Sequence, residues 1–245
     1  MRLFGLIGYP LTHSFSQKYF NEKFQKLCIA NALYENFSIP TIEELTIILD
    51  TKKGLEGFNI TIPYKKAVIN FLDELSEPVK KMGACNCVKI IDGKLIGFNT
   101  DIVGFQKSLQ PFLKPNHQKA LILGTGGASA AVEYVFQQLN ITYQFVSRTA
   151  SSTAISYRDL NSEIMESHQL IINTTPLGMY PNLEDLPEIP YEFITDKHHL
   201  FDLIYNPTET KFLTIGKQKG ASIQNGYEML ILQAEESWRI WNEIT

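Results

Sequence analysis

Residues Gly124-Thr125-Gly126-Gly127-Ala128-Ser129 form a glycine-rich stretch that decides the fold of this chain. The apolar run 120–123 leads into the stretch, and a helical pattern of apolar residues follows it. A strand, a glycine turn and a helix in this order are typical of a dinucleotide site, because the glycines let backbone amides approach a pyrophosphate and the helix N-terminus favours an anion. The stretch therefore predicts a dinucleotide-binding domain.

The end of the next apolar run indicates which dinucleotide is bound. Run 143–146 ends in Ser147-Arg148-Thr149, where a dinucleotide fold meets the adenosine ribose. Proteins that hold NAD usually place a carboxylate here, and this strand end has none. It offers a guanidinium between two hydroxyls, and the planar fork of an arginine suits a phosphate. The sequence thus predicts NADP as the cofactor.

Length, composition and charge narrow the class of protein. The chain has 245 residues, 44% of them hydrophobic, with a formal net charge of -4. These values predict one large or two modest globular domains, and they disfavour nucleic acid or an anionic membrane as a partner. The apolar stretch 1–8 is too short for a signal peptide, and no run reaches transmembrane length. We therefore expect a cytoplasmic protein that acts on a small molecule.

Three cysteines, Cys28, Cys85 and Cys87, are an odd number, and two of them are only two residues apart. This spacing predicts neither a disulfide framework nor a metal site, so we expect three free thiols.

Apolar strand patterns alternate with helical patterns along the chain, which predicts an α/β fold with parallel sheets and crossover helices. We expect two domains. Residues 1–101 plus 226–245 would form an N-terminal α/β substrate-binding domain, and residues 102–225 a Rossmann-like doubly wound NADP-binding domain. The last helical pattern, 226–243, has an apolar stripe that we expect to pack on the N-terminal domain.

Two shorter segments carry local signals. Asp92-Gly93, between apolar runs, is a strong signal for a β-hairpin turn. In the segment 150–169, Ser151-Ser152-Thr153 is a poor helix interior, so we expect an abbreviated helix there.

Four polar clusters in the N-terminal half lie at predicted strand ends and helix starts: 13–16, 59–65, 83–86 and 99–101. Each has an ordinary explanation when taken alone, such as helix capping by the serines or solvation of a lysine. Their joint occurrence is not explained in this way. We expect these clusters to supply the groups that bind the substrate.

The clusters and the glycine stretch resemble the ordered signature of the shikimate dehydrogenases, and the resemblance spans nearly the whole chain. Seven motifs occur in the order of that family: Ser14-Phe15-Ser16, Asn59-Ile60-Thr61-Ile62-Pro63-Tyr64-Lys65, Gly83-Ala84-Cys85-Asn86, Asn99-Thr100-Asp101, Gly124-Thr125-Gly126-Gly127-Ala128-Ser129, Asn173-Thr174-Thr175-Pro176-Leu177-Gly178, and Asn225-Gly226-Tyr227-Glu228-Met229-Leu230 with Gln233.

The resemblance implies the reversible NADPH-dependent reduction of 3-dehydroshikimate to shikimate, a step in chorismate and aromatic amino acid biosynthesis. Hydride adds to the ketone carbon, so negative charge develops on the ketone oxygen and a placed donor must neutralise it. The resemblance assigns this work to Lys65 as general acid/base, with Asp101 binding the adjacent hydroxyl and holding the ammonium. Which of the two moves the proton stays open.

The resemblance also implies the binding residues, and it implies no metal. On the substrate side, Ser14 and Ser16 would bind the carboxylate, and the ring hydroxyls and carboxylate surroundings would fall to Thr61, Asn86, Tyr205 and Gln233. On the cofactor side, the pyrophosphate would lie on Gly124, Thr125, Gly126, Gly127 and Ala128, and the 2′-phosphate on Ser147, Arg148 and Thr149. Near the nicotinamide half we expect Asn173, Leu203 and Gly226, with Glu77 at its edge.

One departure from the family pattern bears on the cofactor. The family commonly has Asn where this chain has Ser147, a change that could loosen the preference for NADP. Three alternatives stay open: a quinate/shikimate dehydrogenase with relaxed NAD/NADP use, a non-catalytic sensor on the same scaffold, and a methylene-tetrahydrofolate dehydrogenase. The serine pair and Asn99-Thr100-Asp101 favour shikimate over the last. We expect a monomer or homodimer.

Overall fold

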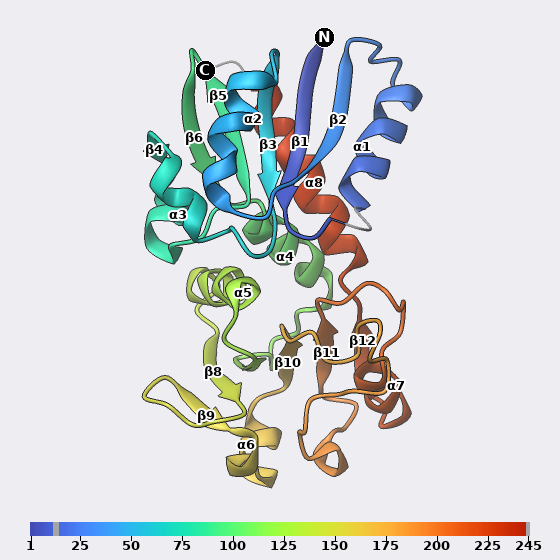
Figure 1. Cartoon of the computed structure of the whole chain (residues 1–245). Helices are drawn as coiled ribbons and strands as arrows, with labels where there is room; N and C mark the ends of the chain where they lie inside the picture. The colour runs from blue at the N-terminus through green and yellow to red at the C-terminus, as the bar shows by residue number, and fades with distance from the viewer. Residues whose placement is uncertain (12–14, 244–245) are drawn as a thin grey trace. The chain divides into compact units, whose positions relative to one another are not determined.

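The computed structural model describes residues 1–11 and 15–243, and the chain divides into two compact units (Figure 1). Unit 1 comprises Met1–Thr100 with Ala234–Thr245, and unit 2 comprises Asp101–Gln233. The domain boundaries expected from the sequence, 1–101 with 226–245 and 102–225, stay a proposal.

Unit 1 is built on a six-stranded mixed sheet in the order β2-β1-β3-β5-β6-β4. Its strands are β1 (Arg2–Gly8), β2 (Ala32–Ser38), β3 (Leu55–Ile60), β4 (Glu74–Leu75), β5 (Cys87–Ile91) and β6 (Lys94–Phe98). The expected parallel pairing is confirmed for β1, β2 and β3, whereas β5 runs antiparallel to both of its neighbours. Asp92 and Gly93 both have positive φ (50° and 80°), which suits a two-residue turn and confirms the hairpin prediction.

Helices cover both faces of this sheet (Figure 1). They are α1 (Phe15–Lys26), α2 (Leu45–Thr51), α3 (Glu77–Met82), the second half of α8 (Tyr227–Asn242), and short 3₁₀ turns at Ile42–Glu44 and Ala67–Phe71. Because side chains alternate along a strand, Ile7 packs in the cluster that contains Leu45, and Phe4 in the cluster that contains Phe20 and Trp241.

The C-terminal half of α8 packs within unit 1, as the apolar stripe predicts. Trp241 stacks on Phe4 with ring centroids 4.8 Å apart, and its Nε1 donates to the carbonyl of Val88 at 3.0 Å. Ala234 is fully buried in the same cluster. This expectation is confirmed.

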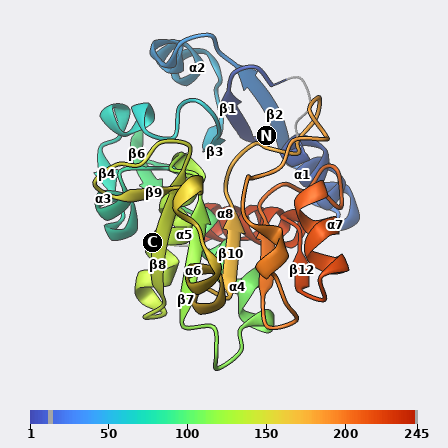
Figure 2. The same ribbon diagram turned by 90° about the horizontal axis from the view of Figure 1, so that it is seen from below.

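Unit 2 is built on a six-stranded parallel sheet in the order β12-β11-β10-β7-β8-β9. Its strands are β7 (Lys119–Leu123), β8 (Thr142–Ser147), β9 (Ala154–Ser156), β10 (Leu170–Asn173), β11 (His199–Asp202) and β12 (Ser222–Gln224). The chain leaves β7 towards β9, then returns to β10 on the other side of β7, and Figure 2 shows this lateral order. This is the doubly wound topology that the glycine stretch predicts, with its switch point between β7 and β10.

The helices of unit 2 are α4 (Asp101–Leu109), α5 (Gly127–Gln138), α6 (Ser162–Ser167), α7 (Lys211–Gln218) and the first half of α8, with 3₁₀ turns at Gln110–Phe112, Tyr157–Asp159 and Tyr191–Phe193. The abbreviated helix expected after β8 is confirmed, because 150–169 forms only β9, one 3₁₀ turn and the six-residue α6. Within the described ranges, no helix has the length and apolar character needed to cross a membrane.

Candidate active site

The predicted substrate residues of unit 1 lie on segments that meet at one edge of its sheet. Thr61 directly follows β3, and its amide donates to the carbonyl of Ile7 at 2.9 Å. The amide of Ile60 donates to the carbonyl of Asn86 at 2.9 Å, so the start of β5 lies beside the end of β3. Gly8 is required here, because a Cβ would lie 2.4 Å from Cγ2 of Thr61. These close approaches bring Thr61 and Asn86 together.

Lys65 lies in a tight turn just beyond Thr61 and is partly exposed. The amide of Tyr64 donates to the carbonyl of Thr61 at 2.9 Å, and the Tyr64 hydroxyl donates to the carbonyl of Ile39 at 2.7 Å. The carbonyl of Lys65 accepts from the amide of Cys85 at 2.8 Å. The backbone that presents the lysine is therefore held on both sides.

The amide side chain of Asn86 fixes the segment that precedes α4. Its Oδ1 accepts from the amide of Thr100 at 2.7 Å, and its Nδ2 donates to Oγ1 of Thr100 at 3.1 Å. Asn99 is held in turn, because its Nδ2 donates to the carbonyl of Ala84 at 2.9 Å. Asp101 then begins α4 with only 9% of its surface exposed, and a carboxylate is favoured in the first turn of a helix.

The two predicted carboxylate-binding serines precede and begin α1. Ser14 lies outside the described residues. Ser16 lies in the first turn of α1, and its hydroxyl is hydrogen-bonded to the phenol of Tyr34. Burial raises the pKa of that phenol well above its usual value, so the phenol stays protonated at neutral pH.

Two further predicted substrate residues lie in unit 2. Gln233, on α8, is 9% exposed, and its Nε2 donates to the carbonyl of Leu230 at 2.9 Å. A Cβ on Gly104 of α4 would lie 3.0 Å from Cβ of Gln233, so the glutamine packs against the helix that Asp101 begins. Tyr205 follows β11 with 37% of its surface exposed, and burial of the remainder raises its pKa.

The glycine loop of unit 2 has the backbone geometry of a pyrophosphate site. Gly124 follows β7 with φ of 100°, its amide donates to the carbonyl of Val146 at 2.8 Å, and a Cβ would lie 2.9 Å from Cγ2 of Thr175. Gly126 is the N-cap of α5 and Gly127 its first residue. A Cβ at either position would meet nothing within 4 Å in the described structure. The loop thus leaves open space before a helix N-terminus whose first turn has no acidic residue, which fits an anionic group.

The end of β8 presents a cation. Arg148 is exposed, and it forms no salt bridge with any residue that the structure describes. The hydroxyl of Ser147 donates to the carbonyl of Thr149, so the strand end is a closed polar turn. The guanidinium therefore remains for a ligand, and the residues present fit a 2′-phosphate.

Asn173 and Asp202 form a buried polar pair at the ends of β10 and β11, and neither side chain is exposed. Asn173 Nδ2 donates to Oδ1 of Asp202 at 3.1 Å, while its own Oδ1 accepts from the amide and hydroxyl of Thr175 at 3.0 and 2.6 Å. Asp202 also accepts from the amide of Ile204 at 3.0 Å and from Oγ1 of Thr210 at 2.6 Å. Burial raises the pKa of this carboxyl to about 6.

The three predicted nicotinamide residues are brought together beside this pair. The amide of Leu203 donates to the carbonyl of Asn173 at 3.0 Å, and the amide of Gly226 donates to the carbonyl of Ile204 at 3.0 Å. A Cβ at Gly226 would lie 2.1 Å from the carbonyl oxygen of Leu203, so only glycine fits. Glu77, by contrast, lies in unit 1 at the start of α3, where Lys80 lowers the pKa of its carboxyl through an exposed ion pair.

Known proteins are similar to this chain over nearly its whole length. A family model described as the shikimate dehydrogenase substrate binding domain matches residues 6–88. A Clostridium beijerinckii protein named shikimate dehydrogenase (NADP(+)) is 38% identical over 99% of this chain and 93% of its own length. The chain belongs to the shikimate dehydrogenase family.

Solved structures of the family have the same fold. The shikimate 5-dehydrogenase of Thermus thermophilus, in complex with NADP(H) and shikimate, has a TM-score of 0.88 at 29% identity, covering 100% of this chain and 94% of that one. A quinate dehydrogenase from Corynebacterium glutamicum, in complex with NAD, also has a TM-score of 0.88, at 25% identity, covering 99% and 94% of the two chains. Both the α/β class and the Rossmann-like nucleotide fold expected for the family are confirmed.

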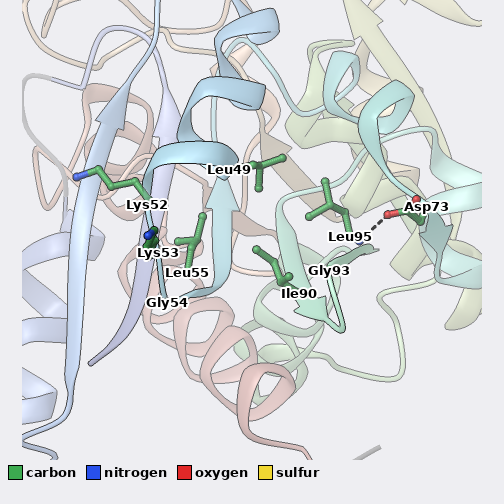
Figure 3. A pocket seen from close by; sticks show the side chains of 9 residues that line it. All are labelled: Leu49, Lys52, Lys53, Gly54, Leu55, Asp73, Ile90, Gly93 and Leu95. Carbon is green, nitrogen blue, oxygen red and sulfur yellow. Dashed lines mark hydrogen bonds between the residues drawn. The ribbon is translucent and has the colours of Figure 1, made fainter.

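A separate pocket of about 310 Å³ lies at the opposite edge of the unit 1 sheet, around the start of β3 and the β5–β6 hairpin (Figure 3). Its lining mixes apolar and charged side chains and contains none of the predicted site residues: Leu49, Lys52, Lys53, Gly54, Leu55, Asp73, Ile90, Gly93 and Leu95. Asp73 accepts from the amide of Leu95 at 2.7 Å, and Lys52 pairs with Glu35 at 2.8 Å. Because no predicted site residue lines it, this pocket is not the site expected of the family.

Sequence reasoning missed Tyr34, Ser237 and Asp202 as members of the polar edges. Tyr34 reads as one more aromatic residue of a half-buried strand, and Ser237 as a polar residue of an amphipathic helix. Of the three, Asp202 was the residue that the sequence could have indicated, because it is a carboxylate at the end of an otherwise apolar run.

Proposed function

We propose that this protein is an NADP-dependent oxidoreductase that catalyses the reversible reduction of 3-dehydroshikimate to shikimate, in chorismate and aromatic amino acid biosynthesis. The observation that carries the proposal is the sheet edge of unit 1, where Asn86 fixes Thr100 directly before the buried Asp101, in a chain that also has the glycine loop before α5. Close relatives bear the same activity in their names.

The chemistry assigned to the chain's own residues begins with Lys65. NADPH supplies the hydride when bound, so the carbonyl π electrons move onto the ketone oxygen as the new C–H bond forms. Lys65 stabilises that oxygen through its ammonium and transfers a proton to it, then recovers a proton from solvent. Asp101 binds the neighbouring hydroxyl and holds the ammonium in place.

The remaining residues bind and orient the substrate. Ser14 and Ser16 donate to the carboxylate, and the hydroxyls and carboxylate surroundings are bound by Thr61, Asn86, Tyr205 and Gln233. Neutral donors and acceptors of this kind suit a polyhydroxylated ring. In this assignment the buried bonds between Asn86 and Thr100 leave one Nδ2 proton of Asn86 for a substrate hydroxyl.

The geometry of unit 2 supports the cofactor assignment for every residue in it except Glu77, which lies in unit 1. The pyrophosphate lies on the amides of 124–128, the 2′-phosphate on Ser147, Arg148 and Thr149, and the nicotinamide half near Asn173, Leu203 and Gly226, with Glu77 at its edge. The side chain of Asn173 is held in a fixed orientation by its bonds to Thr175 and Asp202. We also propose a cytoplasmic monomer or homodimer.

A quinate/shikimate dehydrogenase with relaxed NAD/NADP use is the second candidate. Ser147 favours it, because its hydroxyl donates to the carbonyl of Thr149 where the family commonly offers an asparagine amide. The similarity to a quinate dehydrogenase that binds NAD points the same way.

One assay separates these functions. Shikimate-dependent reduction of NADP and of NAD is followed by the absorbance of the reduced nicotinamide, and both are repeated with quinate. The proposal expects turnover of shikimate with a clear preference for NADP. Comparable turnover of quinate and NAD would establish the second candidate, and absence of turnover with both substrates would reject both.

A further inference from the structure

Asp202 is a carboxylate with no exposed surface, at the last position of β11. A buried carboxylate is normally paired with a cation, because moving an isolated charge out of water is costly. Within residues 1–11 and 15–243, Asp202 forms no salt bridge with a lysine, an arginine or a histidine. Its charge is therefore left without a counter-charge in the described part of unit 2, and this requires an explanation.

Three neutral donors hold this carboxylate in place. Oδ1 accepts from Nδ2 of Asn173 at 3.1 Å and from the amide of Ile204 at 3.0 Å, and Oδ2 accepts from Oγ1 of Thr210 at 2.6 Å. Donors favour the ionised form and oppose the effect of burial, which raises the pKa of the carboxyl to about 6. Asp202 thus carries a fixed negative charge at pH 7 and above.

The topology of unit 2 places this charge beside one half of the dinucleotide site. In an open parallel sheet a ligand lies across the carboxyl ends of the strands at the switch point, here between β7 and β10. The glycine loop follows β7, and Arg148 follows β8 on one side of it. If the pyrophosphate lies on the loop and the adenosine half beside Arg148, the nicotinamide half extends over the ends of β10 and β11. Asp202 is the last residue of β11.

Backbone hydrogen bonds tie Asp202 to the segments that are proposed to lie near the nicotinamide. The amide of Leu203, the next residue, donates to the carbonyl of Asn173 at 3.0 Å. The amide of Gly226 donates to the carbonyl of Ile204 at 3.0 Å, and the amide of Ile204 is itself bonded to Asp202. The carboxylate therefore lies directly behind the backbone of this half of the site.

The two redox forms of the cofactor differ in charge at the nicotinamide ring. The ring of NADPH is neutral, and the ring of NADP⁺ carries one positive charge, which arises when the hydride leaves with its pair of electrons. A fixed negative charge nearby attracts the cationic ring and has no comparable effect on the neutral ring. The effect is strongest in a buried position of low dielectric constant, as at Asp202.

We propose that the carboxylate of Asp202 is the counter-charge of the oxidised nicotinamide ring. It favours the binding of NADP⁺ over NADPH, and it stabilises the positive charge that develops as hydride passes to the ketone. Asn173 and Thr210 hold the carboxylate in position. The inference rests on the proposed function, because it takes a nicotinamide dinucleotide as the cofactor of unit 2.

The test replaces Asp202 by asparagine, which keeps the shape of the side chain and removes its charge. Its Oδ1 can still accept from Asn173 and Ile204, and the hydroxyl of Thr210 can rotate to accept from the new Nδ2. The Kd values of NADP⁺ and NADPH are measured by calorimetric titration at pH 8 without substrate. We expect Asp202→Asn to lower the ratio of the NADPH Kd to the NADP⁺ Kd by about 3- to 30-fold, the size of one partly screened charge interaction.

Two controls separate the charge from the structural role of the side chain. Thr210→Val removes one hydrogen bond to the carboxylate and leaves its charge, and Asp196→Asn removes an exposed carboxylate shortly before β11. Both variants should keep the ratio within about twofold of the wild-type value. A purely structural role of Asp202 would weaken both redox forms alike. An unchanged ratio in Asp202→Asn, or an equal change in Thr210→Val, would therefore overturn the inference.

A second variant keeps the inference testable if Asp202→Asn does not fold. Asp202→Ser also removes the charge, needs less space and retains a hydroxyl oxygen as an acceptor, so the same fall in the ratio is expected. Wild-type binding of both redox forms is measured first. Failure to bind either form would reject the proposed function together with this inference, whereas intact binding with an unchanged ratio in the variant would reject the inference alone.

Discussion

The polar edges of the sheets in the two units are built from different chemical groups. In unit 1, buried side chains bond to one another, as Asn59, Ser237 and Thr100 do. In unit 2, glycines bring backbone amides and carbonyls close together, as Gly124 and Gly226 do. A surface made by side chains can match the hydroxyls of one particular ring, whereas a surface of backbone amides recognises any phosphate of suitable shape. We therefore expect substitutions in unit 1 to act on substrate specificity, and steric changes in unit 2 to act on the cofactor and on stability.

The largest effect is expected at Lys65, the residue of unit 1 that is proposed to transfer a proton to the substrate. Lys65→Ala should lower kcat by about 100- to 10,000-fold, the usual range for a general acid/base, while shikimate binding remains measurable. The neighbouring exposed Lys66 is the matched control, and Lys66→Ala should have little effect. Steady-state kinetics and calorimetric titration of both variants test this. A loss below about tenfold for Lys65→Ala at neutral pH would contradict its assignment.

A glycine pair tests the backbone character of the unit 2 edge. Gly124 and Gly220 both have positive φ, but a Cβ at Gly124 would lie 2.9 Å from Cγ2 of Thr175, whereas one at Gly220 would be in ordinary van der Waals contact, 3.6 Å from Cβ of Asp196. Gly124→Ala should lower the free energy of unfolding by about 2 to 4 kcal/mol and raise the KM for NADP, since strain and overpacking add. Gly220→Ala should lower that free energy by about 1 to 2 kcal/mol, with an unchanged KM.

Urea unfolding and cofactor kinetics of the two glycine variants provide the comparison. If both lose the same stability and both keep the wild-type KM for NADP, the backbone at Gly124 does not shape the cofactor site.

Arg148 lies in unit 2 but is proposed to bind the cofactor through its side chain. Replacing it should have a smaller effect than replacing Lys65. A charge-assisted hydrogen bond corresponds to a preference for NADP over NAD of about 10- to 150-fold, and we expect the lower part of this range because Ser147 replaces an amide. Arg148→Ala should raise the KM for NADP and barely change that for NAD. Catalytic efficiencies with both cofactors measure this.

Arg158, exposed after β9, is the control for Arg148. Arg158→Ala should leave the cofactor preference unchanged. Equal losses for NAD and NADP in Arg148→Ala would indicate that this arginine supports the fold and does not bind the 2′-phosphate.

The smallest expected effect is on the pH dependence of stability. In unit 1 the buried polar side chains of Asn59, Thr100 and Ser237 are neutral, whereas β11 in unit 2 contains His199 and Asp202. Burial lowers the pKa of His199 from 6.5 to about 4, so the unfolded chain binds the proton first as pH falls, and stability is lost below about 6.5. Burial raises the pKa of Asp202 from 3.8 to about 6, so its contribution has the opposite sign and stability is gained below about 6.

Between pH 7 and 5, these two contributions amount to a loss of about 2 kcal/mol for His199 and a gain of about 1 kcal/mol for Asp202, so they cancel only in part. His199→Gln should remove the first, so the variant should become more stable relative to wild type, by about 2 kcal/mol, as pH falls from 7 to 5. Urea unfolding at the two pH values measures the difference. Parallel pH dependences of the two proteins would contradict the role of His199.

Local signals in the sequence were sufficient for much of the fold. The glycine stretch predicts β7 and α5, the Asp92-Gly93 pair predicts the hairpin, and the apolar run 170–173 matches β10. Apolar and polar residues alternate over 58–62 and predict a strand there, whereas β3 spans Leu55–Ile60, because Ile62 lies in the turn and is 73% exposed. Alternation of apolar and polar residues does not reveal where a turn begins.

Other features depend on contacts that no local pattern encodes. The bond between Asn59 and Ser237 joins residues 178 positions apart, and that between Tyr34 and Asn59 joins residues 25 apart. The three-residue β9 is too short for any periodicity to show. The family resemblance predicted which residues contact ligands. It did not predict which buried side chains hold those residues in place. The site assignments themselves stay predictions.

Unit 1 is discontinuous in the chain, and this affects its synthesis. Its interior combines Phe4 and Phe20, which are synthesised before unit 2, with Ala234 and Trp241, which are synthesised after it. While the intervening residues are translated, the aromatic face of β1 and α1 has no covering helix. The N-terminal unit therefore completes its core only after unit 2 has been synthesised, which reverses the usual N-terminal-first order of domain folding.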